Sequence, residues 1–173
     1  MKYKSENLDD TKKIAEKVAK SIKGNEILCL YGDLGSGKTT FSKMLAQSLG
    51  FKDDITSPTF IIRADHENNG MYLYHFDWYR LDDQKDLEMV GFYDTLGHGV
   101  VIIEWADKFS NVIEELESRS SESRSGGPRS INHSKVIRMY FKHVESGSRS
   151  IGSDGSRDDN IREIEVKYGN INN

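Results

Sequence analysis

The apolar residues of this chain fall into short runs whose spacing separates helices from strands. Residues 11–22 and 39–49 carry apolar side chains one turn apart, which predicts two amphipathic helices. Asp10 or Thr11 is placed to cap the first helix, and Gly50 follows the second. The positions that set this spacing are Ile14, Val18 and Ile22 in the first helix and Phe41, Met44, Leu45 and Leu49 in the second.

Runs with a different pattern predict strands. Ile27–Tyr31 and Val100–Ile103 are wholly apolar and too short to form helices of their own, so both are expected to be buried strands. Residues 136–141 and 161–168 alternate between apolar and polar, as half-buried strands do. The first buried strand, a Gly-rich loop and the helix at 39–49 therefore follow one another directly.

A hairpin and two short helices lie between the buried strands in this interpretation. Residues 59–63 and 71–79 flank the polar turn at 66–70, which predicts two antiparallel strands. Helices are expected over residues 82–89 and 107–116. The order of elements indicates an α/β protein.

Two segments rich in Ser, Arg and Gly interrupt the pattern at residues 118–133 and 145–160. They carry almost no apolar side chains, so burial cannot offset the entropy lost on ordering them. Both are expected to be flexible insertions in a single domain that spans residues 1–173, a length typical of one domain.

Composition and charge narrow the classes of function. The net charge of -4 argues against binding nucleic acid or a membrane surface through bulk positive charge. One cysteine, Cys29, excludes an internal disulfide and a zinc site built from several cysteines. No run of about 18 apolar residues predicts a transmembrane helix, and the first residues lack the apolar core of a signal peptide. The expected location is the cytoplasm.

The strongest chemical signal is a phosphate-binding loop between the first buried strand and the helix that follows. Gly32–Thr39 matches Gly-x-x-x-x-Gly-Lys-Ser/Thr in full. Glycines let backbone N–H groups curl around phosphate, and the helix N-terminus adds positive potential to the same site. Lys38 can reach the β- and γ-phosphates, and the Thr39 hydroxyl is placed to bind Mg²⁺.

A phosphate loop needs carboxylates at the ends of neighbouring strands to hold the metal or to order the attacking water. Glu104 follows the strand at 100–103, and Asp77 ends an apolar stretch of the predicted hairpin. Both are candidate catalytic residues beside Lys38. Spacing alone does not decide which of the two carboxylates contacts the metal.

Three further features of the sequence also have ordinary structural explanations. Asp94–Gly97 has the Asp-x-x-Gly pattern of GTPases, but the chain has no Asn-Lys-x-Asp guanine-reading sequence, so a turn is expected there. For His75, a hydrogen-bonded structural role is favoured over a base or a ligand. Arg80 could approach the γ-phosphate, although an ion pair with Asp82, Asp83 or Asp86 is the simpler interpretation.

Several motifs occur together in one order: the phosphate loop, Thr56–Phe60, His75–Leu81 and Glu104 followed by Trp105. On these motifs the chain resembles the TsaE family, also called YjeE, over residues 5–116. The resemblance implies a three-layer P-loop NTPase-like α/β fold whose sheet mixes parallel and antiparallel strands. It also implies a weak bacterial ATPase, needed to make N6-threonylcarbamoyladenosine at position 37 of tRNA.

The resemblance further implies partners, cofactors and residue roles. The family acts with the TsaB–TsaD pair, which stimulates its ATPase, so tRNA is expected to be met only through that complex. ATP and Mg²⁺ are the implied cofactors, with Thr39, Glu104 and Asp77 at the metal and Trp105 and Arg80 in a functional patch. Phosphates would be held by Asp33, Leu34, Gly35, Ser36, Gly37, Lys38, Thr39 and Thr40, and Thr56, Ser57, Pro58 and Thr59 would form a switch that senses the γ-phosphate.

Two other functions stay open on the residues alone. A P-loop also fits a small-molecule or nucleoside kinase, which transfers the phosphoryl group to a bound acceptor. Such kinases need a lid with several arginines, and the Arg-rich segments here are unsuitably rich in Ser and Gly. A nucleotide-dependent binding switch with negligible turnover differs from a weak ATPase mainly in rate.

Overall fold

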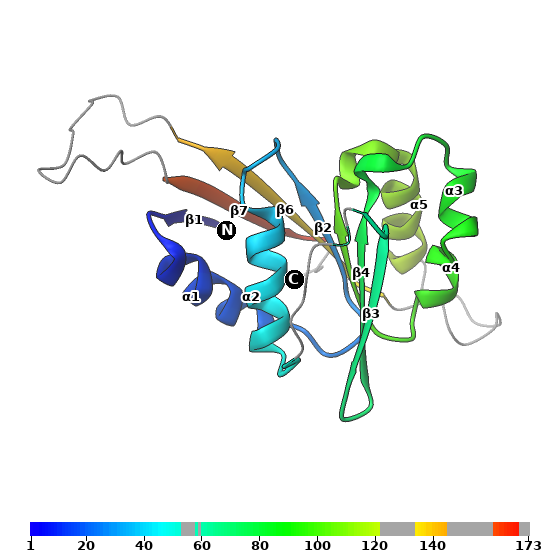
Figure 1. Cartoon of the computed structure of the whole chain (residues 1–173), viewed down its shortest axis with the longest axis horizontal. Coiled ribbons are helices and arrows are strands. Elements are labelled where there is room, and N and C mark those ends of the chain that lie inside the picture. Colours follow the sequence, from blue (N-terminus) through cyan, green and yellow to red (C-terminus); the bar gives the residue numbers. More distant parts are fainter. Residues whose placement is uncertain (53–57, 59, 122–133, 145–160, 170–173) are drawn as a thin grey trace, which may run out of the picture.

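The strands of the described residues form one sheet, and Figure 1 labels most of them. The computed structural model describes residues 1–52, 58, 60–121, 134–144 and 161–169. The sheet has seven strands in the order β1-β7-β6-β2-β5-β4-β3. Their bounds are β1 Lys2–Ser5, β2 Ile27–Tyr31, β3 Arg63–Asn68, β4 Met71–Asp77, β5 Val100–Glu104, β6 Val136–His143 and β7 Arg162–Tyr168.

The centre of the sheet is parallel and its edges are antiparallel. β2 pairs in parallel with β5 and β6, and β5 pairs in parallel with β4. The outer pairs β1–β7, β6–β7 and β3–β4 are antiparallel. The mixed sheet confirms the predicted fold class. It also brings the carboxyl ends of β2, β4 and β5 to one edge, where open α/β sheets bind ligands.

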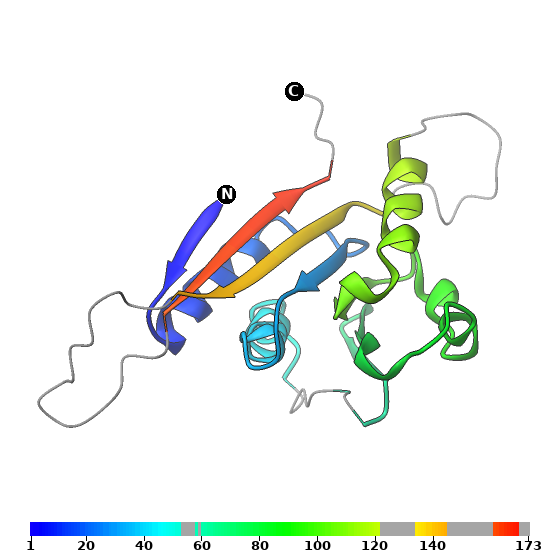
Figure 2. The same cartoon turned by 90° about the horizontal axis from the view of Figure 1, so that it is seen from above.

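Helices cover both faces of the sheet, which gives three layers (Figures 1 and 2). The longer helices are α1 Leu8–Ala19, α2 Lys38–Ser48 and α5 Ser110–Ser121. The shorter ones are α3 Lys85–Met89 and α4 Phe92–Thr95, together with the 3-10 turns η1 Trp78–Arg80 and η2 Ala106–Phe109.

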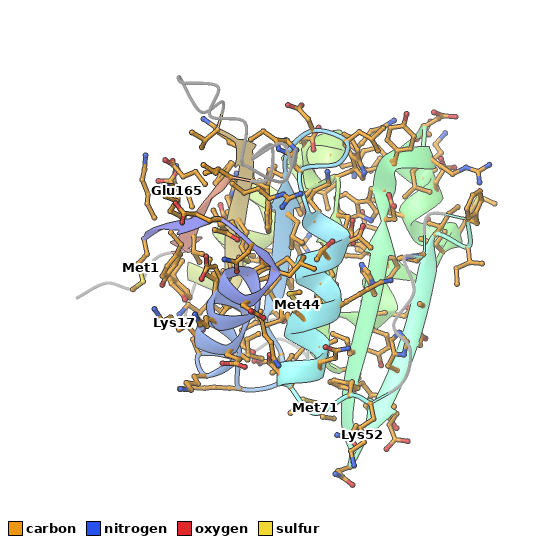
Figure 3. All side chains as sticks on the ribbon, turned by 60° about the vertical axis from the view of Figure 1, so that its left-hand side comes forward. Met1, Lys17, Met44, Lys52, Met71 and Glu165 are labelled. Carbon is orange, nitrogen blue, oxygen red and sulfur yellow. The ribbon has the colours of Figure 1, made fainter. Side chains whose placement is uncertain are left out.

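The alternation of side chains along β2 divides the core into two clusters. Leu28 and Leu30 pack with α1 and α2, for instance against Phe41. Ile27 and Cys29 pack on the opposite face with apolar residues of α3, α4 and α5. Figure 3 looks onto the first of these faces, with Lys17 of α1 and Met44 of α2 labelled. Because both faces are covered, all five residues of β2 are buried.

The predicted hairpin is present, but its first strand lies later in the chain than expected. β3 spans Arg63–Asn68 instead of residues 59–63. Phe60 and Ile61 belong to a turn in which backbone N–H groups bind the Pro58 carbonyl. β3 is a polar strand at the sheet edge, so hydropathy does not mark it, whereas the apolar residues just before it resemble a strand in sequence.

Helix boundaries also differ from the predictions. α1 begins three residues before Thr11, because the side chain of Asn7, and not that of Asp10 or Thr11, caps it by accepting a hydrogen bond from Asp10 N. α4 takes in Asp94 and Thr95, so the expected turn at 94–97 is partly helical. α3 begins at Lys85, later than the expected residue 82.

Two other boundaries concern the predicted insertions and the N-terminal edge. α5 extends to Ser121, so the first residues of the segment 118–133 are helical, while 122–133 and 145–160 lie outside the described residues. β1 had no counterpart among the predicted elements, since four residues at an exposed edge carry little periodicity. Among the described helices, none combines the length and the hydropathy that crossing a membrane requires.

Candidate functional site

The loop from Gly32 to Gly37 joins β2 to α2 in a conformation that depends on glycine. Gly32 has a φ of 143°, and a Cβ at this position would lie 2.5 Å from the carbonyl oxygen of Phe141. Gly37 has a φ of 100° and precedes the first residue of α2. Other residues rarely adopt such angles. The loop can therefore curl tightly against β6 and present its N–H groups at the start of α2.

A pocket of about 230 Å³ opens at this N-terminus. It gathers residues from the loop, from α2 and from the carboxyl ends of β4 and β5, as the parallel sheet predicts. Ten of the predicted site residues line it, together with Tyr79 and Arg162. The ten are Leu34, Gly35, Ser36, Gly37, Lys38, Thr39, Thr40, Asp77, Glu104 and Trp105.

Lys38 is buried and bends back over the loop. Its Nζ donates hydrogen bonds to the carbonyl oxygens of Gly32, at 2.6 Å, and of Asp33, at 2.9 Å. The same nitrogen lies 3.9 Å from the centre of the Trp105 ring, a cation–π contact. Burial lowers the pKa of the Lys38 ammonium, and the carboxylates of Glu104, Asp107, Asp77 and Asp33 oppose that shift. Asp33 contributes to the site through its backbone.

Glu104 lies at the centre of a buried hydrogen-bond network. Thr39 Oγ1 donates to its Oε2 at 2.6 Å. The single proton of Ser42 Oγ is shared between the Lys38 carbonyl oxygen at 3.0 Å and Glu104 Oε1 at 3.2 Å. His75 Nε2 lies 2.8 Å from the same Oε1. These contacts join α2, β4 and β5. The carboxylate predicted from sequence is therefore in direct contact with the hydroxyl predicted to bind the metal.

Asp77 lies next to Glu104 across the sheet. The two residues are partners in the parallel pairing of β4 with β5. Asp77 Oδ1 accepts a hydrogen bond from Tyr79 N at 3.0 Å, which caps η1 and fixes the carboxylate at the pocket. Both predicted acids therefore reach the pocket, and Glu104 is hydrogen-bonded to the phosphate-loop helix through Thr39.

One buried hydroxyl of this pocket lacks a hydrogen-bond partner in the part of the chain that the structure describes, and a bound phosphate group would supply one. Ser36 Oγ is buried and has no hydrogen-bond partner among the described residues. A buried hydroxyl without a partner is costly, and a phosphate oxygen can accept from it. Within the described part of the chain, no three His, Cys, Asp or Glu side chains gather as a metal cage. A cation at Thr39 and Glu104 therefore needs phosphate oxygens and water to complete its shell, as Mg²⁺ sites commonly do.

An aromatic pair forms one wall of the pocket. Trp105 has a φ of 59°, in the left-handed region that is uncommon for tryptophan. Its ring lies 4.8 Å from that of Tyr79, centre to centre. Arg80 is exposed and lies outside the pocket lining. In the described structure Arg80 forms no ion pair with Asp82, Asp83 or Asp86, so the simpler interpretation from sequence is wrong.

The predicted switch falls largely outside the described residues. Thr56, Ser57 and Thr59 are not described, and Pro58 is buried. Beyond them, Ile62 has a φ of 68°, and its carbonyl oxygen accepts a hydrogen bond from Asp77 N. A β-branched residue is strained at this angle. The backbone that follows the predicted switch is thus hydrogen-bonded to the backbone of Asp77, a candidate catalytic acid.

Sequence reasoning missed the contribution of the hairpin formed by β6 and β7. Arg162 lines the pocket, and its Nε would lie 3.1 Å from a Cβ on Gly37. His143 Nε2 lies 3.1 Å from the Gly35 carbonyl oxygen. No local pattern marks these residues, because the sheet brings them to the loop from far along the chain. One feature of the sequence could have placed His75 near the site. It precedes Asp77 by two residues, so the two side chains lie on the same face of β4.

Comparison with known proteins identifies a family. A family model described as threonylcarbamoyl adenosine biosynthesis protein TsaE matches residues 5–130. A tRNA threonylcarbamoyladenosine biosynthesis protein TsaE from Bacillus subtilis is 40% identical over 151 residues, which are 86% of this chain and 94% of that protein. The Aquifex aeolicus protein of the same name is 38% identical over 123 residues, or 69% of this chain and 88% of the relative.

A solved structure agrees with this assignment. The crystal structure of YdiB from Bacillus subtilis superposes with a TM-score of 0.60 at 28% identity. The match covers 98% of this chain and 86% of that one. The phosphate loop and both carboxylates lie within the matched residues 5–130, whereas Arg162 and the β6–β7 hairpin lie beyond them.

Proposed function

The chain belongs to the TsaE family of threonylcarbamoyladenosine biosynthesis proteins, and on that premise we propose that it is a Mg²⁺-dependent ATPase serving this tRNA modification. The observation that carries the proposal is the meeting of Lys38, Thr39 and Glu104 at one pocket beside the N-terminus of α2. A helix N-terminus, a mobile cation and a hydroxyl–carboxylate pair are the parts that phosphoryl transfer from a nucleotide needs.

The loop and Lys38 bind the phosphates. Backbone N–H groups of residues 33–40 and the hydroxyl of Ser36 supply neutral donors, and Lys38 supplies charge. Its ammonium now binds two loop carbonyls, and phosphate oxygens are stronger partners for the same donors. Nucleotide binding therefore exchanges carbonyl contacts of Lys38 for phosphate contacts. The absence of the guanine-reading sequence Asn-Lys-x-Asp supports adenine as the base.

Thr39 and Glu104 hold the metal, and Asp77 orders the attacking water. Bound Mg²⁺ neutralises charge that builds up on the phosphate oxygens. Glu104 suits the first role because its Oε2 already contacts Thr39. Asp77 suits the second because its backbone pairing sets it beside Glu104, while its contact with Tyr79 N keeps one oxygen fixed.

Residues around the pocket couple the nucleotide to partner proteins. In this proposal Thr56, Ser57, Pro58 and Thr59 sense the γ-phosphate, and Trp105 and Arg80 belong to the surface that meets the partner. The exposure of Arg80 and of half the Tyr79 side chain supports a surface role there. The partner proposed from the family is the TsaB–TsaD pair in the cytoplasm. Contact with tRNA is indirect in this scheme.

A direct test measures ATP hydrolysis by the purified chain alone and with TsaB–TsaD from the same organism. We expect weak, Mg²⁺-dependent release of inorganic phosphate that increases when the pair is added. Lys38→Ala serves as the inactive control, since it removes the phosphate-binding cation. Absence of both complex formation and stimulation would count against the proposal. Transfer of the phosphoryl group to a small acceptor in place of water would indicate a kinase.

A further inference from the structure

We propose that His75 is a positioning residue that holds Glu104 in place for metal binding. The inference rests on the proposed function and adds a residue to it. His75 lies on β4, and its side chain is completely buried between the sheet and α2. Its Nε2 lies 2.8 Å from Glu104 Oε1, so the ring touches the carboxylate without lining the pocket.

The hydrogen bonds determine which ring nitrogen carries the proton. An ionised carboxylate can only accept, so His75 Nε2 must donate to Glu104. His75 Nδ1 has no hydrogen-bond partner among the described residues. A proton on Nδ1 would therefore be a buried donor without an acceptor, an arrangement that proteins rarely tolerate. The geometry therefore favours a proton on Nε2 that is donated to Glu104.

The two oxygens of Glu104 have different partners. Oε1 lies 2.8 Å from His75 Nε2 on the sheet and 3.2 Å from Ser42 Oγ on the interior side of α2, and the Ser42 proton is shared with the Lys38 carbonyl oxygen. Oε2 accepts from Thr39, which lines the pocket. Contacts on the interior side therefore hold Oε1 in place, and Oε2 is the oxygen that faces the pocket and is available to a metal at Thr39. Anchoring of this kind fixes the orientation of a ligating carboxylate.

A purely structural role for His75 would lead to a different experimental result. If His75 only fills the core, replacing it changes stability and leaves the metal requirement of the folded protein unchanged. If His75 positions Glu104, the change weakens metal binding more than nucleotide binding. Substitution of such supporting residues in metal sites typically costs about 10- to 100-fold in metal affinity or activity.

The test compares His75→Leu, which removes the donor, with His75→Gln, which keeps an N–H at similar reach. Binding of a fluorescent ADP analogue is measured with Mg²⁺ and with EDTA, alongside the melting temperature. We expect His75→Leu to raise the Mg²⁺ concentration for half-maximal binding enhancement by roughly 10- to 100-fold, with affinity in EDTA unchanged. His75→Gln should restore most of the loss. His98→Leu, at an exposed position, is the matched control.

The possible results distinguish the positioning role of His75 from the metal-dependent function itself. An unchanged Mg²⁺ requirement in folded His75→Leu overturns the positioning role, and so does a His75→Gln variant that behaves like the leucine variant. If His75→Leu does not fold, His75→Asn takes its place, because its shorter amide cannot reach Glu104. A wild-type chain whose nucleotide binding ignores Mg²⁺ would instead overturn the metal-dependent function itself.

Discussion

Thr39 Oγ1 donates a hydrogen bond of 2.6 Å to Glu104 Oε2, which joins the first turn of α2 to the end of β5. The two residues are far apart in the chain, and the parallel pairing of β2 with β5 brings them together. If Mg²⁺ binds at this site, Thr39 and Glu104 are the residues that would hold it. The pair therefore offers a sensitive point at which to test the proposed metal site.

Replacing Thr39 should separate metal binding from folding. Thr39→Ala removes the hydroxyl, and we expect Mg²⁺-dependent hydrolysis to fall by at least about 100-fold, since even supporting residues of metal sites cost 10- to 100-fold. Thr39→Ser keeps the oxygen and should retain most activity. Steady-state phosphate release, with circular dichroism to verify folding, checks both. Near-normal turnover in the alanine variant would remove Thr39 from the site.

Arg162 should contribute to nucleotide affinity from the C-terminal hairpin. It adds a second cation to the pocket wall beside Gly37, so we expect Arg162→Ala to weaken ATP and ADP binding by about tenfold, at the lower end of what hydrogen bonds to charged groups contribute. Lys167→Ala, on the exposed side of the same strand, is the control. Isothermal titration calorimetry gives both affinities. Equal loss in the two variants would indicate a general charge effect.

Gly32 and Gly24 both have positive φ, but only Gly32 lies close to β6. Comparing alanine substitutions at the two positions therefore separates the cost of the steric clash with β6 from the cost of backbone strain. Gly32→Ala meets the Phe141 carbonyl oxygen at 2.5 Å, whereas Gly24→Ala meets nothing within 4 Å. We expect Gly24→Ala to lower the free energy of unfolding by about 1 kcal/mol and Gly32→Ala by several times as much. Urea denaturation of both variants provides the comparison. Similar losses would mean that the loop shifts freely away from β6.

Cys29 should report on unfolding. Its side chain is fully buried, and burial raises the pKa of its thiol, so the reactive thiolate is disfavoured in the folded chain. We expect a thiol reagent at neutral pH to modify Cys29 only as the protein opens. Adding Mg²⁺ and ATP should slow the reaction further, because ligand binding stabilises the folded state. Rapid labelling of the native chain would contradict the buried position.

Elements with strong local signals were predictable. β2 has the predicted bounds, and α2 begins one residue earlier than expected, because a continuous apolar run and a helical spacing record burial directly. The polar edge strand β3 was displaced in the prediction, and β1 was absent from it. At a sheet edge only one side of the strand is paired, so burial leaves little trace in the sequence. The cap at Asn7 depended on the path of the chain from β1 into α1.

The sequence by itself determined the family and the phosphate loop, because their motifs require particular residues in a fixed order. It also pointed to the two acids, because each of them ends an apolar run. Only the tertiary structure decided that Glu104 is the acid in contact with Thr39, that His75 contacts the same carboxylate and that Arg162 lines the pocket. These contacts join residues that are distant in the chain. Strand order and register create them, and no local pattern encodes either one.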